Sequence, residues 1–505
     1  MIRSFKMLVA LLCCIAVHTS SGAKEADLAV SNIPADLLKG ANAVTRYQHM
    51  EVQIVSGNEI YITEKIAITI LNEKGAGYKV LRVVHDQFED IEYMEGKLYD
   101  QDGRMMEKMK KKEVIDVNGD AGTFAQDRHT NVFEFECTKY PYTCVYEYKV
   151  VKKQSVFLDP WMPKFGADRS LEQSDVEVQY PLDFPLRYRA FHINDKPTIK
   201  PGDGRNVLSA SISYLAATGK EEDYTVWEYF DTPEIIFAAD KFEMQDRKGD
   251  MASWKGFGQF FYELNKDRDV LPDGMKKIVH SLADTCHTDA GKIRVLYNYL
   301  EHNYRYVLIT FGIGGWQTFD AQFVAEKGYG DCKALSNYMK AILKEAGITS
   351  YAALAYGSKG EYPEMMLDFP YNAFNHVILC VPQAADTTWL ECTSNTLPAG
   401  YLSTHTSNRY VLMLTPYGGV PVKTPGCKNE DNIVSRKADI TVNDKNEMTG
   451  TVDMKYAGEQ WDRESGYVVN APKTFVDNYF NSKLTLANYV ISNYEIDNQS
   501  TAHVP

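Results

Sequence analysis

The chain has 505 residues and a formal net charge of −14 at pH 7, with 44% hydrophobic and 24% charged residues. These proportions are typical of folded globular domains and exclude a disordered or fibrous chain. The length exceeds what a single hydrophobic core supports, so about two to four domains are expected. The acidic balance argues against a nucleic-acid partner, because phosphates attract a basic surface.

The first 23 residues have the three parts of a secretory signal peptide. Arg3 and Lys6 form a basic start, residues 7–17 form an apolar run, and small residues at 21–23 offer a cleavage site. The apolar run is too short to span a bilayer, and no later stretch reaches the length of a transmembrane helix. We therefore expect a protein that is secreted across the inner membrane and acts in the periplasm or outside the cell.

Removal of the signal leaves seven cysteines, at positions 137, 144, 286, 332, 380, 392 and 427. In an oxidising compartment an odd number leaves at least one thiol unpaired or paired with another chain. Cys137 and Cys144 flank a short loop that contains proline. They either form a disulfide across a hairpin or are two buried apolar residues, and the sequence leaves both interpretations open.

Residues 24–232 are expected to form an N-terminal antiparallel β-sandwich domain. Polar and apolar residues alternate over 51–55 and 59–63, on either side of a Ser-Gly-Asn turn, which is the pattern of a β-hairpin. Further alternating runs follow as far as residue 214. Many short strands with turns between them favour a sandwich.

Helical periodicity replaces the alternating pattern between residues 233 and 305. Three helices are predicted there, at 254–265, 275–285 and 290–304. In the last of them four residues share one face, namely Ile293, Leu296, Tyr297 and Leu300. We expect these helices to form the helical side of a central α+β core over residues 250–425.

A further helix is predicted to begin at Cys332, shortly after Gly328 and Gly330. Its apolar residues recur at the spacing of one buried helical face, namely Leu335, Tyr338, Met339, Ile342 and Leu343. The first turn of a helix has unpaired N–H groups and the positive end of the macrodipole, so it favours a thiolate over a thiol. Cys332 is therefore predicted to be a nucleophile at neutral pH.

Two predicted strands downstream carry the partners that a thiolate nucleophile requires. One strand begins at His376, and the next, after a short polar turn, carries Glu391. A catalytic cysteine needs a base to take its proton and a further group to orient that base. We predict that Cys332 is the nucleophile, His376 the base and Glu391 the orienting acid.

The motifs around these residues resemble the transglutaminase-like superfamily, the papain-related group of cysteine peptidases, amidases and acyl transferases. The matching segments are Gly-Asp-Cys at 330–332, Asn-His-Val at 375–377 and Trp-Leu-Glu-Cys-Thr at 389–393. The resemblance covers roughly residues 270 to 400. It implies a papain-like α+β core and catalysis by a Cys-His-acid triad. The chain departs from the usual pattern at Glu391, where the family ordinarily has Asp.

The resemblance also suggests how the site would bind a reaction intermediate. Attack by a thiolate on a carbonyl develops an oxyanion, which needs preset hydrogen-bond donors. The backbone N–H of Cys332 is one candidate. Papain-like enzymes use an upstream Gln and animal transglutaminases a Trp, so the resemblance makes Gln317 or Trp316 the second candidate.

The regions on either side of the core complete the expected layout. Residues 24–232 resemble the uncharacterised β-sandwich domain that precedes transglutaminase-like cores in many secreted bacterial proteins, a domain with no established activity. A new β pattern starts at Ser435, and we expect a C-terminal β-rich domain over 433–505 that is incomplete in this chain. The expected fold class is multidomain α+β.

No cofactor and no metal are expected. The fragments 116–120 and 444–446 resemble parts of a calcium loop, but neither has the distal Glu at the required spacing, and both are interpreted as turns. Cys332, His376 and Cys392 lack the short ligand spacing of a zinc module.

The sequence predicts a secreted transglutaminase-like cysteine enzyme that acts on peptide or amide bonds through a thioacyl intermediate. Water as the acceptor would give a peptidase or amidase, and an amine would give a cross-linking acyl transferase. The expected partner is a peptide, protein or cell-envelope peptide substrate. The alternative is a non-catalytic periplasmic or cell-surface binding or scaffold protein. The sequence leaves the oligomeric state open.

Overall fold

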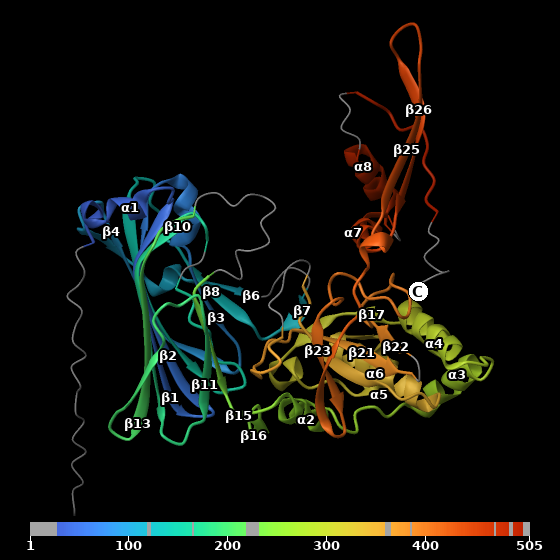
Figure 1. The fold of residues 1–505 in the computed structure, drawn as a ribbon, viewed down its shortest axis with the longest axis horizontal. Helices are drawn as coiled ribbons and strands as arrows, with labels where there is room; N and C mark the ends of the chain where they lie inside the picture. The colour runs from blue at the N-terminus through green and yellow to red at the C-terminus, as the bar shows by residue number, and fades with distance from the viewer. Residues whose placement is uncertain are drawn as a thin grey trace, which may run out of the picture.

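The computed structural model describes residues 28–118, 123–163, 166–218, 232–358, 365–383, 386–468, 471–483 and 488–497. It shows a large N-terminal sheet, a central region of helices packed on a second sheet, and a C-terminal hairpin with two helices (Figure 1). The predicted multidomain α+β class is therefore confirmed. The predicted signal peptide at 1–23 lies outside the described residues.

An eight-stranded sheet forms the N-terminal region, in the order β12-β13-β10-β1-β2-β9-β4-β5. Its strands are β1 (Ala43–Ser56), β2 (Glu59–Ile70), β4 (Glu89–Tyr99), β5 (Met105–Lys108), β9 (Tyr142–Lys152), β10 (Arg169–Pro181), β12 (Thr198–Pro201) and β13 (Arg205–Leu215). The predicted hairpin is β1–β2, which pairs antiparallel, but β1 and β10 pair parallel. The sheet is therefore mixed instead of antiparallel, because the chain crosses over between β9 and β10 and does not turn back in a hairpin.

Two smaller sheets cover the apolar face of the large sheet. Their strands are β11 (Leu186–Phe191) with β14 (Glu234–Ala239), and β3 (Leu81–His85) with β8 (His129–Phe133) and β6 (Ile115–Asn118). The first small sheet shares a buried cluster with Ile54 and Ile62 of the large sheet, and the second shares one with Ile68 and Tyr146. These layers form the sandwich that the alternating sequence predicts.

The cysteines of this region are free thiols. Cys144 is buried in β9, as the second of the two interpretations given above expects, whereas Cys137 is only half-buried. Burial raises the pKa of the Cys144 thiol to about 12.

Helices in the central region pack on the five-stranded sheet β22-β21-β20-β23-β24. The strands are β20 (Tyr351–Ala355), β21 (His376–Pro382), β22 (Thr387–Leu390), β23 (Tyr410–Thr415) and β24 (Gly418–Lys423). The helices are α2 (Trp254–Leu264), α3 (Asp273–Ala283), α4 (Asp289–Asn303), α5 (Ala321–Lys327) and α6 (Cys332–Glu345). The helices predicted at 254–265, 275–285 and 290–304 correspond to α2, α3 and α4.

Helix α6 lies at the centre of this region, in contact with α3, α4, α5 and β21. Its apolar face consists of Leu335, Tyr338, Met339, Ile342 and Leu343, each at most 1% exposed. These five side chains belong to one core cluster together with residues of α3, α4 and β21. Burial of side chains of this size contributes about 1.5–3 kcal/mol each relative to exposure, so the helix and its N-terminus are firmly held.

A strand of the N-terminal region reaches the central region. β7 (Thr123–Gln126) pairs in parallel with β18 (Leu308–Thr310), and Figure 1 shows β7 extending from β6 towards the central helices and sheet. Next to this pair the Asp127 carboxylate accepts a hydrogen bond of 2.7 Å from the backbone N–H of Gly312. Backbone pairing therefore joins the two regions.

The remaining elements are short or lie at the ends of the chain. They are α1 (Ala35–Leu38), β15 (Lys241–Met244), β16 (Arg247–Asp250), β17 (Arg305–Tyr306), β19 (Tyr329–Gly330), β25 (Val434–Val442), β26 (Met448–Tyr456), α7 (Glu459–Val468) and α8 (Lys473–Lys483). The β25–β26 hairpin projects away from the rest of the molecule (Figure 1). Within the described ranges, every helix is too short or too polar to cross a membrane.

Candidate active site

Cys332 is the first residue of α6, as predicted. The buried Asp331 caps the helix, because its Oδ1 accepts a hydrogen bond of 2.9 Å from the backbone N–H of Ala334. Its Oδ2 accepts a hydrogen bond of 2.6 Å from Lys333 Nζ, which balances the charge of the cap. The cap fixes the first turn of the helix and therefore the position of the sulfur.

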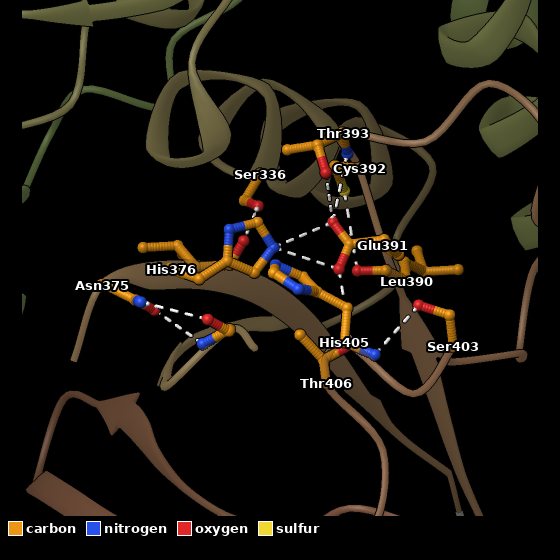
Figure 2. Close-up of polar contacts among 12 residues, drawn as sticks. Ser336, Asn375, His376, Leu390, Glu391, Cys392, Thr393, Ser403, His405 and Thr406 are labelled. Carbon is orange, nitrogen blue, oxygen red and sulfur yellow. Dashed lines mark hydrogen bonds and ion pairs between the residues drawn. The ribbon is translucent and has the colours of Figure 1, made fainter. Parts of the chain in front are cut away.

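His376 and Glu391 meet at the ends of two adjacent strands of the sheet, although the sequence predicted Glu391 inside its strand. His376 begins β21, and Glu391 directly follows the end of β22. The Nε2 atom of His376 lies 3.0 Å from both carboxylate oxygens of Glu391, and the two side chains are only 9% and 4% exposed (Figure 2). This contact occupies Nε2 and leaves Nδ1 of the ring for another partner.

The imidazole and the sulfur belong to one site. Cys332 and His376 both line a cavity of about 280 Å³. Burial acts to lower the pKa of His376, but the charge of Glu391 and the nearby Cys332 side chain raise it to about 10. Burial acts to raise the pKa of Glu391, but the imidazolium and hydrogen bonds from Thr393 lower it. At neutral pH the pair is therefore an imidazolium and a carboxylate.

Several hydrogen bonds hold Glu391 in place. The Thr393 hydroxyl donates to Oε1 at 2.6 Å, and the Thr406 hydroxyl donates to Oε2 at 3.4 Å (Figure 2). The Tyr297 hydroxyl donates to the backbone carbonyl of Glu391 at 2.7 Å. A buried carboxylate is costly unless its oxygens are satisfied, so the contacts with Thr393 and Thr406 stabilise the charged form. The bond from Tyr297 holds the backbone at Glu391. Thr393 lies in the motif named above. The periodicity of α4 predicted Tyr297 on a buried face, but nothing in the sequence linked Tyr297 or Thr406 to Glu391.

A second histidine packs against the first. The rings of His376 and His405 are 5.1 Å apart at an interplanar angle of 68°. Gly357 leaves room for this contact, because a Cβ atom there would lie 2.4 Å from His405 Nε2. Asn375 holds Gly357 through hydrogen bonds of 2.6 and 3.1 Å to its backbone. The sequence analysis missed His405, which lies in an irregular segment outside the three motifs.

The structure places the two candidate oxyanion donors differently. Trp316 lines the cavity and packs at 5.9 Å against the ring of Phe261. Gln317 uses its Nε2 to donate a hydrogen bond of 2.8 Å to the carbonyl of Leu264, so one of its two N–H groups is already engaged. The oxyanion role of each residue stays a prediction.

Aromatic and charged side chains together line the cavity. They include Phe261, Trp316, Phe374, Lys266, Asp267 and Lys333. Such a lining suits a ligand with both apolar and polar parts. In the part of the chain that the structure describes, one group of three potential metal ligands lies within mutual reach, and it is on β3, β6 and β8 instead of at this cavity.

Comparison with known proteins identifies part of the chain and its fold. Residues 44–218 match the family model of DUF3857, a Domain of Unknown Function with a solved structure. No curated protein matches the chain. A crystal structure of a putative protease from Parabacteroides distasonis superimposes with a TM-score of 0.57 at 14% identity, over 76% of this chain and 72% of that one.

A weaker likeness involves a putative cysteine protease from Cytophaga hutchinsonii. It covers 79% of this chain and 90% of that one, at 7% identity and a TM-score of 0.22, which is too low to support an argument. The Parabacteroides structure shows a shared fold and leaves the activity open, because the identity is low. The chain therefore carries a DUF3857 domain and shares the fold of a protein described as a putative protease.

Proposed function

We propose that the chain is a transglutaminase-like cysteine enzyme that acts on peptide or amide bonds. The observation that carries the proposal is the contact of His376 Nε2 with both oxygens of a buried Glu391, while the same imidazole shares a cavity with Cys332 at a helix N-terminus. Covalent catalysis by cysteine requires a nucleophile, a base and an orienting acid, and we assign these roles to Cys332, His376 and Glu391. The fold shared with a putative protease supports a peptide substrate.

In the proposed reaction Cys332 attacks the carbonyl carbon as a thiolate. A C–S bond forms, and the tetrahedral intermediate collapses with cleavage of the C–N bond, while the His376 imidazolium gives its proton to the leaving amine. Water or an amine then attacks the thioester carbon, and His376 takes the proton of that acceptor. The C–S bond breaks, which releases the acyl product and returns Cys332 to the thiolate. Glu391 holds the ring in one orientation throughout and stabilises its charged form.

The electrostatics of the site support this division of roles. The pKa of His376 is about 10, so the ring carries a proton at neutral pH. An imidazolium next to a cysteine favours the thiolate and is also the acid that the leaving amine needs. Secretion to the periplasm or the cell exterior remains part of the proposal, on the basis of the sequence of residues 1–23.

The first test is labelling of the full chain with iodoacetamide at pH 7, with each modified cysteine identified by mass spectrometry. Cys332 should react faster than the half-buried Cys286 and Cys427, although it is only 7% exposed. His376→Ala should slow labelling of Cys332 by at least about tenfold, because the thiolate loses its counterion. The same variant should leave the labelling of Cys286 unchanged, which provides a control within the molecule.

The second part of the test is turnover of peptide and peptidoglycan fragments by the wild type and by Cys332→Ala. Release of product by the wild type alone supports the enzyme. Equal labelling of Cys332 with and without His376, and no turnover by either chain, would favour the binding or scaffold protein instead.

A further inference from the structure

We infer that His85, Asp116 and His129 form a binding site for a divalent transition-metal ion, of the Zn²⁺ type, in the N-terminal region. The three residues lie on three neighbouring strands, β3, β6 and β8. One ring nitrogen of each histidine and one carboxylate oxygen lie within 4.8 Å of one another. Two imidazoles and a carboxylate are ligands that zinc takes in proteins.

The register of the small sheet brings the three side chains to one face. His85 is paired with His129 across β3 and β8, and Asp116 is paired with Asn131 across β6 and β8. Side chains of residues 129 and 131 point to the same side, because strand residues alternate. Leu81 and Val83 belong to the buried core of this region, and Val83 is paired with Asn131. The three ligands therefore lie on the same face of the sheet as Leu81 and Val83, nearer to its edge.

The distances are close to those of a coordinated ion. His129 Nδ1 lies 3.0 and 3.1 Å from the two oxygens of Asp116, and the rings of His85 and His129 are 5.3 Å apart at 28°. Bonds of about 2.0–2.2 Å in tetrahedral geometry place ligand atoms about 3.3 Å from each other. Rotation of the side chains within the 4.8 Å group would be enough to reach this spacing.

The surroundings favour a metal over a simple ion pair. An ion pair needs one imidazole, as His49 and Asp175 illustrate in the large sheet, whereas here a second imidazole stacks against the first. Asn131 Oδ1 lies 3.4 Å from His85 Nε2 and is placed to orient that ring, as outer-sphere groups do at metal sites. Mixed nitrogen and oxygen donors select zinc-like ions over Ca²⁺ and Mg²⁺, which prefer oxygen ligands.

The site also differs from what the sequence analysis expected for this segment. Asp116 was assigned to a turn over 116–120, but residues Ile115–Asn118 form strand β6. His85 and His129 are separated from it by many residues, so the sequence lacks the short ligand spacing that marks a zinc module. Only the pairing of β3, β8 and β6 assembles the three ligands.

A bound ion would stabilise the segment that connects the N-terminal region to the central region. His129 lies two residues after Asp127, whose carboxylate binds the backbone of Gly312. The strand that pairs with β7 contributes Leu308 and Thr310 to the lining of the Cys332 cavity. The proposed ion would thus stabilise the segment through which the N-terminal region reaches the edge of the cavity.

The test uses the full chain with Cys332→Ala, which removes the cavity thiol as a competing ligand. After treatment with a chelator and its removal, the protein is titrated with Zn²⁺ against a chromophoric chelator. One Zn²⁺ per chain should bind, and the affinity should fall at least about tenfold in His85→Ala and in Asp116→Asn. His49→Ala should bind as the parent does. Absence of uptake, or equal uptake in the ligand variants, would overturn the inference.

Thermal unfolding measurements show whether each variant still folds. Asp116→Asn keeps the size of an exposed side chain, so it should unfold at nearly the parent's temperature without metal. Zn²⁺ should raise the unfolding temperature of the parent and leave that of Asp116→Asn almost unchanged, because only the parent binds the ion. An equal rise in both proteins would count against the site.

Discussion

Two histidine–carboxylate pairs in this chain have the same contact distance and different surroundings. The closest nitrogen–oxygen distance is 3.0 Å both in His376–Glu391 and in His129–Asp116. The side chains of the first pair are 9% and 4% exposed, and those of the second are 31% and 54% exposed. Charges attract strongly where water is excluded, whereas solvent screens an exposed pair.

The comparison shows that burial decides what such a pair can do. In the central region the buried carboxylate, with Cys332, holds His376 in its charged form, which suits proton transfer to a leaving group. In the N-terminal region the half-exposed pair has a second imidazole beside it, an arrangement that suits an ion arriving from solvent. The same two functional groups therefore support two different proposals in one chain.

The largest effect should come from removing the buried charge. Glu391→Gln leaves the imidazolium without its counterion in an apolar environment and should lower the free energy of unfolding by about 3–5 kcal/mol. Asp175→Asn, which breaks the exposed pair with His49, should cost less than about 1 kcal/mol. Urea denaturation of both variants measures the difference. Similar losses in the two variants would show that burial does not distinguish the pairs.

The pH dependence of stability should differ between the buried pair and its variant. The pKa of His376 rises from its ordinary 6.5 in the unfolded chain to about 10 in the folded one. Between these values the folded state binds more protons, so the stability contributed by His376 is complete below pH 6.5 and is lost as the pH rises through 10.

Within that window the free energy of unfolding should change with pH by up to about 1.4 kcal/mol per pH unit because of this one proton. This change is measured as the difference between the wild type and His376→Ala in urea denaturation from pH 6 to 10, so that titration of groups that do not interact with His376 cancels. A constant difference over this range would contradict a charged His376 in the folded protein.

The smallest effect should come from the exposed pair. In the presence of a chelator Asp116→Asn should change the free energy of unfolding by less than about 1 kcal/mol, because solvent screens its contact with His129. The same urea experiment compares this change with that of Glu391→Gln. An equal loss of unfolding free energy would show that the half-exposed cluster stabilises the fold as much as the buried pair does.

Much of the site was predictable because its signals are local. The spacing of Leu335, Tyr338 and Ile342 identifies the buried face of α6 within a few turns, and a helix that starts at Cys332 follows from it. The strand that begins at His376 follows from a short motif as well, whereas Glu391, predicted inside the next strand, directly follows its end. The contacts of Thr406 and His405 with these residues were not predictable, since they depend on how an irregular segment returns to the sheet.

The sequence by itself determined the class of the fold and the helix with Cys332 at its start, and it singled out the three residues of the proposed catalytic set. Periodicity and turn residues act over a few neighbouring positions, so they can be recognised without coordinates. The tertiary structure alone decided that β10 lies parallel to β1, that Glu391 is enclosed by Tyr297 and Thr406, and that β3, β6 and β8 bring two histidines to Asp116. These outcomes depend on the packing of segments far apart in the chain, where local preference carries no information about the partner.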